Sequence, residues 1–525
     1  MHRTHTGTRL RLGGVLRAVA ASVAATAIAL VGCRSTGPQD ASREIACPTR
    51  PNIVLIFADD LGYGEIGCYG QTKIDTPNID RLAREGLRFT QFYTAAPVCA
   101  PSRAALVTGL HLGHAPIRDN TEIEPEGQGP LPAGTTTLAH DLKSAGYTTA
   151  CIGKWGLGFV GSSGDPNAMG FDLFFGLNCQ RQAHNYYPTH LWRNDQRVAL
   201  DGNDPKARAE SVYAPDLMLA EARAFIAQSR EKPFFLAYTS TLPHMAMQPK
   251  AVDLKPYDLR FDETPYVGGK GYLPHPTPRA AYAAMITRLD AEVGALRAEL
   301  ERHGLAQNTL IVVTSDNGPT HDVGGVDTGF FDSTAGLRGR KGSVWEGGIR
   351  VPGIAWWPRH VRAGETTAVP AWSVDLRATF ASLAGAATPP TDGQDLSGLL
   401  LRGESLPPRA LYFPFPGYGG QEAVRDGDWK AVRTALRKRE GGWPALEGWQ
   451  LYNLADDPIE SRDLAAAHPE IVARLAAIAT REYVAPGPIE NGNFRIGREG
   501  DPPPTPPPAP APAVPTQAPA AVPSR

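Results

Sequence analysis

The chain has 525 residues and a formal net charge of -2, with 52 Lys and Arg residues against 54 Asp and Glu residues. A balance this close gives no long-range field that would gather nucleic acid or an anionic membrane surface, so charge predicts neither as a partner. The length suits one large domain together with a smaller one.

The first 32 residues are typical of an export signal. Several arginines precede an Ala-rich apolar run at 18–31, which is too short to span a bilayer comfortably. The run ends in Leu30-Val31-Gly32-Cys33, which resembles the lipobox of bacterial lipoproteins, where a peptidase cuts before a cysteine that then receives lipid. An ordinary signal peptide with a chance cysteine is the alternative, but small residues before Cys33 favour the lipoprotein.

The lipobox interpretation predicts where the protein works. We expect a signal peptide at 1–32, lipid on Cys33 and a polar tether at 33–50. Lipid would hold the chain at a membrane surface without a transmembrane helix. The predicted location is the bacterial cell envelope or periplasm, with the lipid anchor as the only membrane contact.

Four short apolar runs, at 52–58, 148–153, 233–239 and 309–315, lack polar alternation and are followed by polar residues. This pattern is typical of buried parallel strands. In an open α/β sheet, ligands bind outside the carboxyl ends of the strands, so we expect the polar residues to converge there. They are Asp59, Asp60, Lys154, His244, Asp316 and Asn317.

Helical and antiparallel patterns complete the predicted fold. A helix is expected over 279–303, with apolar residues on one stripe and Gly304 at its end. Beyond Leu411, short aromatic and charged pieces predict antiparallel strands, and 469–483 predicts a closing helix. The fold class is α/β, a mostly parallel central sheet flanked by helices with a small antiparallel sheet beside it. The predicted units are 51–401 (catalytic), 402–495 (C-terminal subdomain) and 496–525 (a disordered Pro- and Ala-rich tail).

Six cysteines occur without the close spacing that would indicate zinc. If Cys33 and Cys99 are modified, four remain that an exported protein can pair as disulfides, and the sequence does not fix the pairing. Cys151 lies inside an apolar strand and is equally typical of a buried free thiol. The four are Cys47, Cys68, Cys151 and Cys179.

The segment from Cys99 to Gly109 is the most informative. Its core Cys99-Ala100-Pro101-Ser102-Arg103, followed by Leu106, Thr108 and Gly109, resembles the signature of the type I, formylglycine-dependent sulfatases of the alkaline-phosphatase-like superfamily. Further segments resemble that family in the same order along the chain. They are 52–62, 76–83, 153–155, 315–318, 338–341 and 346–352.

The resemblance implies a mechanism. Cys99 would be oxidised to formylglycine by a formylglycine-generating enzyme, and one hydroxyl of the aldehyde hydrate would attack the sulfate ester while the other later expels sulfate. Asp59, Asp60, Asp316 and Asn317 offer hard oxygen donors, which suit Ca²⁺, with residue 99 as a further metal ligand. Arg103, Lys154 and Lys341 would neutralise developing charge, and His244 would protonate the leaving group. Spacing places Arg103 one helical turn from Cys99, within reach of the hydrate.

One position departs from the family pattern. Many members carry His two residues after the lysine, where this chain has Gly156. The aromatic segment 182–188 is the nearest that could supply a replacement, so His184 and Asn185 are candidate substrate-binding residues. A structural aromatic loop is the equal alternative. His321, Asp332 and Arg181 are candidate selectivity contacts because they flank the motifs.

The predicted function is hydrolysis of sulfate monoesters, of a sulfated carbohydrate or of aryl sulfates. Two alternatives stay open. A phosphomonoester or phosphonate hydrolase of the same superfamily would use similar residues, and an inactive surface protein would keep calcium only to bind sulfated glycan. Retention of Cys99, Arg103, Lys154 and Lys341 argues against the inactive protein, because a binding module needs no nucleophile.

The lipobox interpretation is tested by labelling. Radiolabelled fatty acid supplied to the producing cells should enter the wild-type protein and not Cys33→Ala, because the lipid is attached at that thiol. Equal labelling of the two proteins would eliminate the lipoprotein.

Overall fold

The computed structural model describes residues 50–485, except 205–209, 270–271, 388 and 437–447. The predicted signal peptide, Cys33, Cys47 and the Pro- and Ala-rich tail lie outside the described residues. Within the part that is described, no helix is long and apolar enough to cross a membrane.

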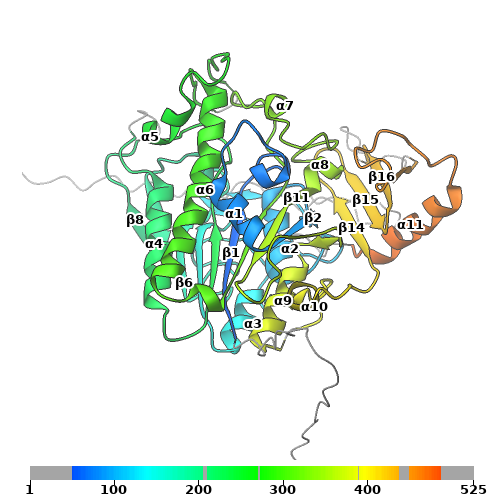
Figure 1. The fold of residues 1–525 in the computed structure, drawn as a ribbon, viewed down its shortest axis with the longest axis horizontal. Coiled ribbons are helices and arrows are strands. Elements are labelled where there is room, and N and C mark those ends of the chain that lie inside the picture. The colour runs from blue at the N-terminus through cyan, green and yellow to red at the C-terminus, as the bar shows by residue number, and fades with distance from the viewer. Residues whose placement is uncertain (1–49, 205–209, 270–271, 388, 437–447, 486–525) are drawn as a thin grey trace, which may run out of the picture. The chain divides into compact units, whose positions relative to one another are not determined.

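A large sheet of eleven strands forms the centre of the fold (Figure 1). Its strands are β1 (Asn52–Ala58), β2 (Leu87–Tyr93), β5 (Thr148–Lys154), β6 (Leu173–Leu177), β7 (His190–Arg193), β8 (Gln196–Ala199), β9 (Phe234–Thr239), β10 (Thr309–Ser315), β11 (Arg350–Trp356), β12 (Glu365–Thr367) and β13 (Ala371–Trp372). Their order is β12-β2-β11-β10-β1-β9-β5-β6-β7-β8, with β13 also paired to β2.

The middle of this sheet is parallel. The neighbours β10, β1, β9, β5 and β6 all run in the same direction. The four predicted strands are four of these five, so the prediction of a mostly parallel central sheet is confirmed. Because the five strands run the same way, the residues that follow them emerge at one edge.

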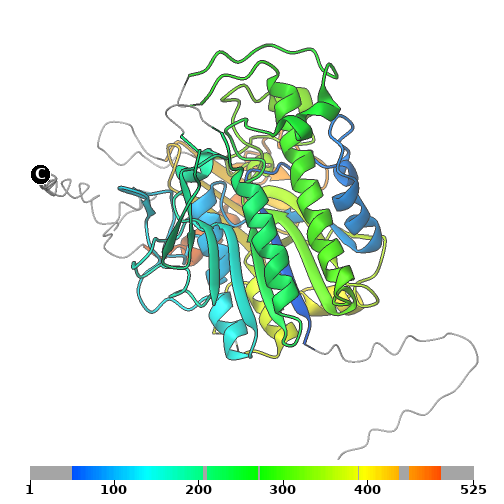
Figure 2. The ribbon, with the colours of Figure 1, turned by 90° about the vertical axis from the view of Figure 1, so that its left-hand side faces the viewer.

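Helices cover both faces of the sheet. They are α1 (Pro77–Glu85), α2 (Cys99–Thr108), α3 (Leu138–Ser144), α4 (Ala214–Gln228), α5 (Ala251–Leu254), α6 (Pro278–Arg302), α7 (Thr328–Phe331), α8 (Glu346–Ile349), α9 (Asp375–Ala384) and α10 (Ser397–Arg402), and the short pair β3 (Glu122–Ile123) and β4 (Gly127–Gln128) lies apart from the sheet. Side chains alternate along β1, so that Val54 and Ile56 share a core with α4 and α6, whereas Leu55 and Phe57 share one with α2, α3 and α9. Figure 2 shows α4 and α6 as neighbouring green helices against one face.

The helix predicted over 279–303 from its apolar stripe is confirmed as α6. The residues of its apolar stripe are all fully buried: Tyr282, Ile286, Leu289, Val293, Leu296 and Leu300. The helix ends at Arg302, and Gly304 follows with φ of 69°, a left-handed conformation that glycine adopts without a steric penalty.

A separate antiparallel sheet lies beside the large one, as predicted (Figure 1). It comprises β14 (Ala410–Phe415), β15 (Gln421–Asp426), β16 (Trp429–Thr434) and β17 (Gln450–Asn453), followed by α11 (Pro469–Glu482). One face packs on α11 through Val424, Leu451 and Leu475. The other face packs on the large sheet through Phe413 and Trp372.

The small sheet also holds the segment that carries Lys341. The Gln421 amide nitrogen donates to the carbonyl oxygen of Gly342 at 2.7 Å, and its oxygen accepts from the Val344 N–H at 3.2 Å. Nearby, the fully buried ammonium of Lys430 lies 2.9 Å from Glu346 and 2.8 Å from Glu460. These contacts fix the strands of the small sheet to the polypeptide next to Lys341.

The cysteines among the described residues are free thiols. Cys68, Cys99, Cys151 and Cys179 form no disulfide. Of the two interpretations of Cys151, the structure shows the buried thiol, because this side chain is only 1 % exposed.

Replacing Lys430 tests the contact between the two sheets. Lys430→Ala should lower the free energy of unfolding by about 3–5 kcal/mol, because it leaves the buried carboxylate of Glu460 without its cation and leaves Glu346 with Arg350 alone. Lys143→Ala is the control, since the Lys143–Asp172 pair is about half exposed and such pairs contribute about 0–1 kcal/mol. Chemical denaturation measures both, and equal small losses would contradict the proposed importance of the buried contact.

Candidate active site

Two pairs of polar residues meet where β1 and β10 end. Asp316 N–H donates to the carbonyl oxygen of Ala58 at 3.0 Å, and Asp60 N–H donates to Asp316 Oδ1 at 3.1 Å. The amide nitrogen of Asn317 donates to Asp60 Oδ1 at 2.7 Å. Asp60 has φ of 67°, in the left-handed region that residues other than glycine seldom occupy. The parallel register of the two strands therefore brings together residues about 250 positions apart in sequence.

This group of residues has the donors that a hard cation requires. Asp59, Asp60, Asp316 and Asn317 are each fully buried. The amide oxygen of Asn317 is buried without a hydrogen-bond donor among the described residues. A buried, unpaired oxygen beside three carboxylates fits a Ca²⁺ ligand, because Ca²⁺ binds carboxylate and amide oxygens. Asp59, Asp60, Cys99 and His244 also lie close enough to share one ion.

Each carboxylate of this group is paired with one buried cation. Lys154 Nζ lies 2.6 Å from Asp59 Oδ2, and Lys341 Nζ lies 2.7 and 2.9 Å from the two oxygens of Asp60. Asp316 accepts from the Arg103 guanidinium at 2.8 and 3.2 Å. Three negative and three positive side chains are therefore buried together.

The pairing decides the protonation of these groups. Burial raises the pKa of Asp59, but Lys154, His244 and Arg103 outweigh it and hold that pKa well below its usual range. Burial likewise raises the pKa of Asp60, and Lys341 more than offsets the rise. Burial and the nearby Asp59 raise the pKa of Asp316 to about 6. All three side chains are thus mainly ionised at neutral pH.

Cys99 is the first residue of α2 and lies within this charged group. Its Sγ is 3.5 Å from Asp59 Oδ1 and 3.5 Å from Lys341 Nζ. The Asn120 side chain accepts from the Ala100 N–H at 2.9 Å and so fixes the first turn of the helix. Burial, together with Asp316, raises the pKa of the Cys99 thiol.

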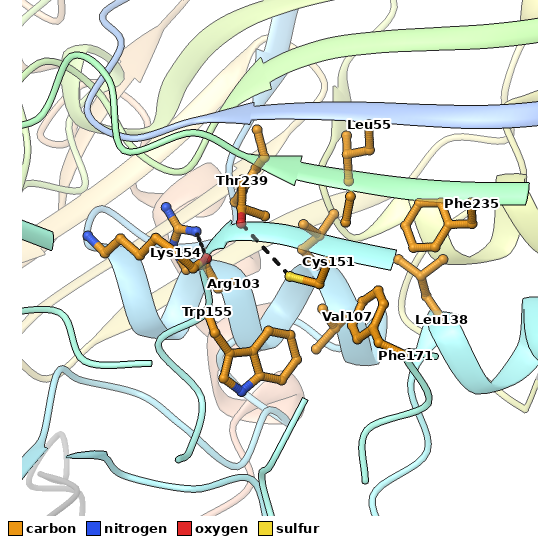
Figure 3. A pocket seen from close by; sticks show the side chains of 13 residues that line it. Leu55, Arg103, Val107, Leu138, Cys151, Lys154, Trp155, Phe171, Phe235 and Thr239 are labelled. Carbon is orange, nitrogen blue, oxygen red and sulfur yellow. Dashed lines mark hydrogen bonds between the residues drawn. The ribbon is translucent and has the colours of Figure 1, made fainter. Parts of the chain in front are cut away.

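Arg103 lies one helical turn after Cys99 and is buried beside it. Its guanidinium donates to Asp316 and, at 2.7 Å, to the carbonyl oxygen of Lys154. An apolar pocket surrounds its aliphatic part, and Figure 3 shows Arg103 and Lys154 at one end of this pocket with Phe171 and Phe235 at the other. Packing thus directs the guanidinium towards the ends of β5 and β10.

His244 follows β9 and faces Lys341. Its Nδ1 is 2.6 Å from the carbonyl oxygen of Met245, so Nδ1 carries the proton and donates. The other nitrogen, Nε2, then accepts from Lys341 Nζ at 3.1 Å and lies 3.5 Å from Asp60. Burial and Lys341 lower the pKa of His244 to about 4, so the neutral ring dominates at neutral pH.

The remaining predicted residues take different places. The His184 ring stacks on His244, with 4.4 Å between centroids, and burial and His244 lower its pKa to about 2. Asn185 Oδ1 accepts from the N–H of Tyr187 at 2.9 Å, which is a local turn contact. His321 Nε2 lies 3.3 Å from the hydroxyl of Tyr418 at a more exposed position.

The other two candidates that flank the motifs, Arg181 and Asp332, make contacts with neighbouring residues. Arg181 is half exposed and pairs with Glu124, and the exposed Asp332 accepts from the N–H of Gly336. Sequence reasoning did not single out Asn120, whose side chain accepts from the Ala100 N–H and which belongs to no motif that would have marked it. Tyr186 lies within the predicted segment 182–188 but was not named as a contact, and its hydroxyl donates to the carbonyl oxygen of His244 at 2.6 Å.

A family profile, two relatives and a solved structure each match most of this chain, and the profile and both relatives are named sulfatases. The sequence profile described as Sulfatase matches residues 51–386. Human arylsulfatase A is 34% identical over 87% of this chain and 92% of its own length, and an N-acetylgalactosamine-6-O-sulfatase of Bacteroides thetaiotaomicron is 30% identical over 86% and 96%. The crystal structure of Ps i-CgsB in complex with k-i-k-neocarrahexaose has a TM-score of 0.69 at 29% identity, covering 83% of this chain and 94% of that one.

Proposed function

The chain belongs to the sulfatase family and is a sulfuric ester hydrolase, and on that premise we propose that it hydrolyses sulfate monoesters of carbohydrates at residue 99. The observation that carries this proposal is the position of Cys99. It begins α2 within a buried group of three carboxylates and three cations. The proposal further includes formylglycine at position 99 and a calcium ion.

The charges of the group fit this chemistry. The three carboxylates and three cations cancel, so a bound Ca²⁺ would supply the positive charge that a sulfate ester anion and an ionised nucleophile require. Asp59, Asp60, Asp316 and Asn317 would hold the ion, in agreement with the unpaired amide oxygen of Asn317. The N-terminus of α2 adds further positive potential at residue 99.

Formylglycine gives residue 99 two equivalent hydroxyls in its hydrate. One hydroxyl would serve as the nucleophile towards sulfur, and the other would allow sulfate to be released with return of the aldehyde. Lys154 and Lys341 lie where their ammonium groups can stabilise charge on the sulfate oxygens. Arg103 orients Asp316 through two hydrogen bonds. A formylglycine-generating enzyme would be the partner that matures Cys99.

The leaving oxygen needs a proton, and Lys341 and His244 together can deliver one. The proton lies on Lys341 Nζ, which donates to His244 Nε2 at 3.1 Å. The proton stays on Lys341 Nζ in the resting site, because Asp60 outweighs burial and holds the pKa of Lys341 well above its usual value, while burial and Lys341 lower the pKa of His244 to about 4. The departing alkoxide is a stronger base than either side chain and would take a proton from this hydrogen-bonded pair as it leaves. The hydrogen bond from Nδ1 to Met245 holds the ring in the orientation that this transfer requires.

A carbohydrate substrate is supported by two relatives. One is named an N-acetylgalactosamine-6-O-sulfatase, and the other was crystallised with a neocarrahexaose. The name of human arylsulfatase A supports aryl sulfates as convenient test substrates. We also propose that 51–401 carries the catalytic groups, that 402–495 positions the Lys341 segment, and that the enzyme is exported and lipid-anchored in the cell envelope.

A substrate panel tests the function. The mature enzyme should release sulfate from defined sulfated sugars and from an aryl sulfate, and Cys99→Ser should lose nearly all of this turnover, because the nucleophile is absent. Matched phosphate monoesters and phosphonates are measured under the same conditions. Faster turnover of those esters than of every sulfate would contradict a sulfatase.

Calcium removal should lower the rate far more than the stability. Because Lys154, Lys341 and Arg103 already neutralise the three carboxylates, the fold does not depend on the ion. Chelation should therefore collapse kcat and leave a cooperative thermal transition, and added Ca²⁺ should restore kcat. Normal turnover of the metal-free enzyme would refute the four assigned ligands.

The role of His244 is tested with two leaving groups. His244→Ala should slow poorly activated sugar sulfates by roughly 10² to 10⁴, the usual range for a general acid, and slow a nitrophenyl sulfate much less. His184→Ala is the companion variant, because its ring stacks on His244 and is the second candidate. An equal loss on both substrates would assign His244 to sulfate binding instead.

A further inference from the structure

The side chain of Gln180 is buried beside the active site with both of its polar atoms unpaired. Gln180 follows β6 at the same sheet edge as Lys154 and is 5 % exposed. Neither its amide nitrogen nor its amide oxygen has a hydrogen-bond partner among the described residues. Buried polar atoms almost always have one, so a ligand or water is expected at this amide.

The amide occupies the space next to Gly156. A Cβ atom at position 156 would lie 2.1 Å from Gln180 Nε2 and 3.7 Å from Arg103 Cδ. Position 156 also has φ of 77°, a left-handed conformation that glycine adopts without a steric penalty. The Gln180 amide therefore lies where a side chain two residues after Lys154 would lie, next to Arg103.

The surrounding contacts hold the backbone and leave the amide end free. Gln180 N–H donates to Gln128 Oε1 at 3.3 Å, and Gly156 N–H donates to the carbonyl oxygen of Asn178 at 3.2 Å. The same loop carries His184, which stacks on His244. One loop thus brings both Gln180 and His184 to the charged group around Cys99.

We propose that Gln180 Nε2 donates a hydrogen bond to an oxygen of the sulfate group of the bound substrate. A neutral amide N–H can donate a hydrogen bond to an anion. The Gln180 amide lies next to Arg103, whose guanidinium contacts the backbone of Lys154, and these two cations favour an anion nearby. Gln180 would bind and orient the sulfate without transferring a proton. This inference rests on the proposed hydrolysis of sulfate esters at residue 99.

Inorganic sulfate is the probe, used with the mature, calcium-loaded enzyme. Gln180→Ala should raise the inhibition constant of sulfate about 10- to 100-fold, the loss expected for a hydrogen bond to a charged group. Gln180→Glu keeps the shape of the side chain and places a carboxylate near the anion, so its loss should be at least as large. It also decides the question if Gln180→Ala fails to fold.

Gly156→Ala is a second way to displace the Gln180 amide, without changing Gln180 itself. The new methyl group would overlap Nε2, so this variant should weaken sulfate inhibition as Gln180→Ala does, and the double variant should show no further loss. Gln394→Ala is the matched control and should leave inhibition unchanged. Its amide oxygen is also unpaired, but its nitrogen donates to the carbonyl oxygen of Pro407, at a distance from the site.

Two results would overturn the proposal. One is an unchanged sulfate inhibition constant in Gln180→Ala or Gln180→Glu. The other is a loss confined to sugar substrates while sulfate inhibition stays at the wild-type value, which would assign the amide to the sugar. Stabilisation of the fold by sulfate, read from the thermal midpoint, reports binding without turnover. If the wild-type enzyme released no sulfate from any ester, the proposed function would fail, and this binding measurement would still decide the role of Gln180.

Discussion

The pairing of three carboxylates with three cations at one edge of the central sheet is the constraint on which the site depends. Each buried charge would be costly alone, and the distances of 2.6–2.8 Å between partners show that each has its own counter-charge. The neutral group can be buried without a metal ion. It also leaves the site able to take up a dication and an anionic substrate together, which explains why we expect calcium to affect rate more than folding.

Secondary structure supplies the precision of this arrangement. Parallel β1 and β10 bring Asp60 within hydrogen-bond distance of Asp316, and the first turn of α2 sets Cys99 between Asp59 and Lys341. The small sheet contributes from outside, because Gln421 holds the backbone on both sides of Ser343 and hence the segment that carries Lys341. Lys430→Ala therefore acts on the contacts next to the segment that carries Lys341.

The sequence predicted the elements whose pattern is local, and missed the features that depend on tertiary contacts. Apolar runs ending in polar residues predicted the central strands and the convergence at their carboxyl ends, because strand burial and direction follow from composition and topology. The spacing of Arg103 from Cys99 predicted that both side chains lie in one site, but it did not predict the hydrogen bonds of the guanidinium to Asp316 and to the carbonyl oxygen of Lys154. The tautomer of His244 depends on the carbonyl of Met245, and the place of Gln180 depends on the absence of a side chain at Gly156. None of these contacts produces a periodic pattern of residues in the sequence.

The proposed chemistry requires residue 99 to act as an aldehyde hydrate and not as a cysteine. The most direct measurement is the mass of the peptide containing residue 99, taken from purified enzyme of known specific activity. We predict the aldehyde mass, and specific activity in proportion to the converted fraction across preparations. Fully active enzyme in which residue 99 is an intact thiol would contradict the account.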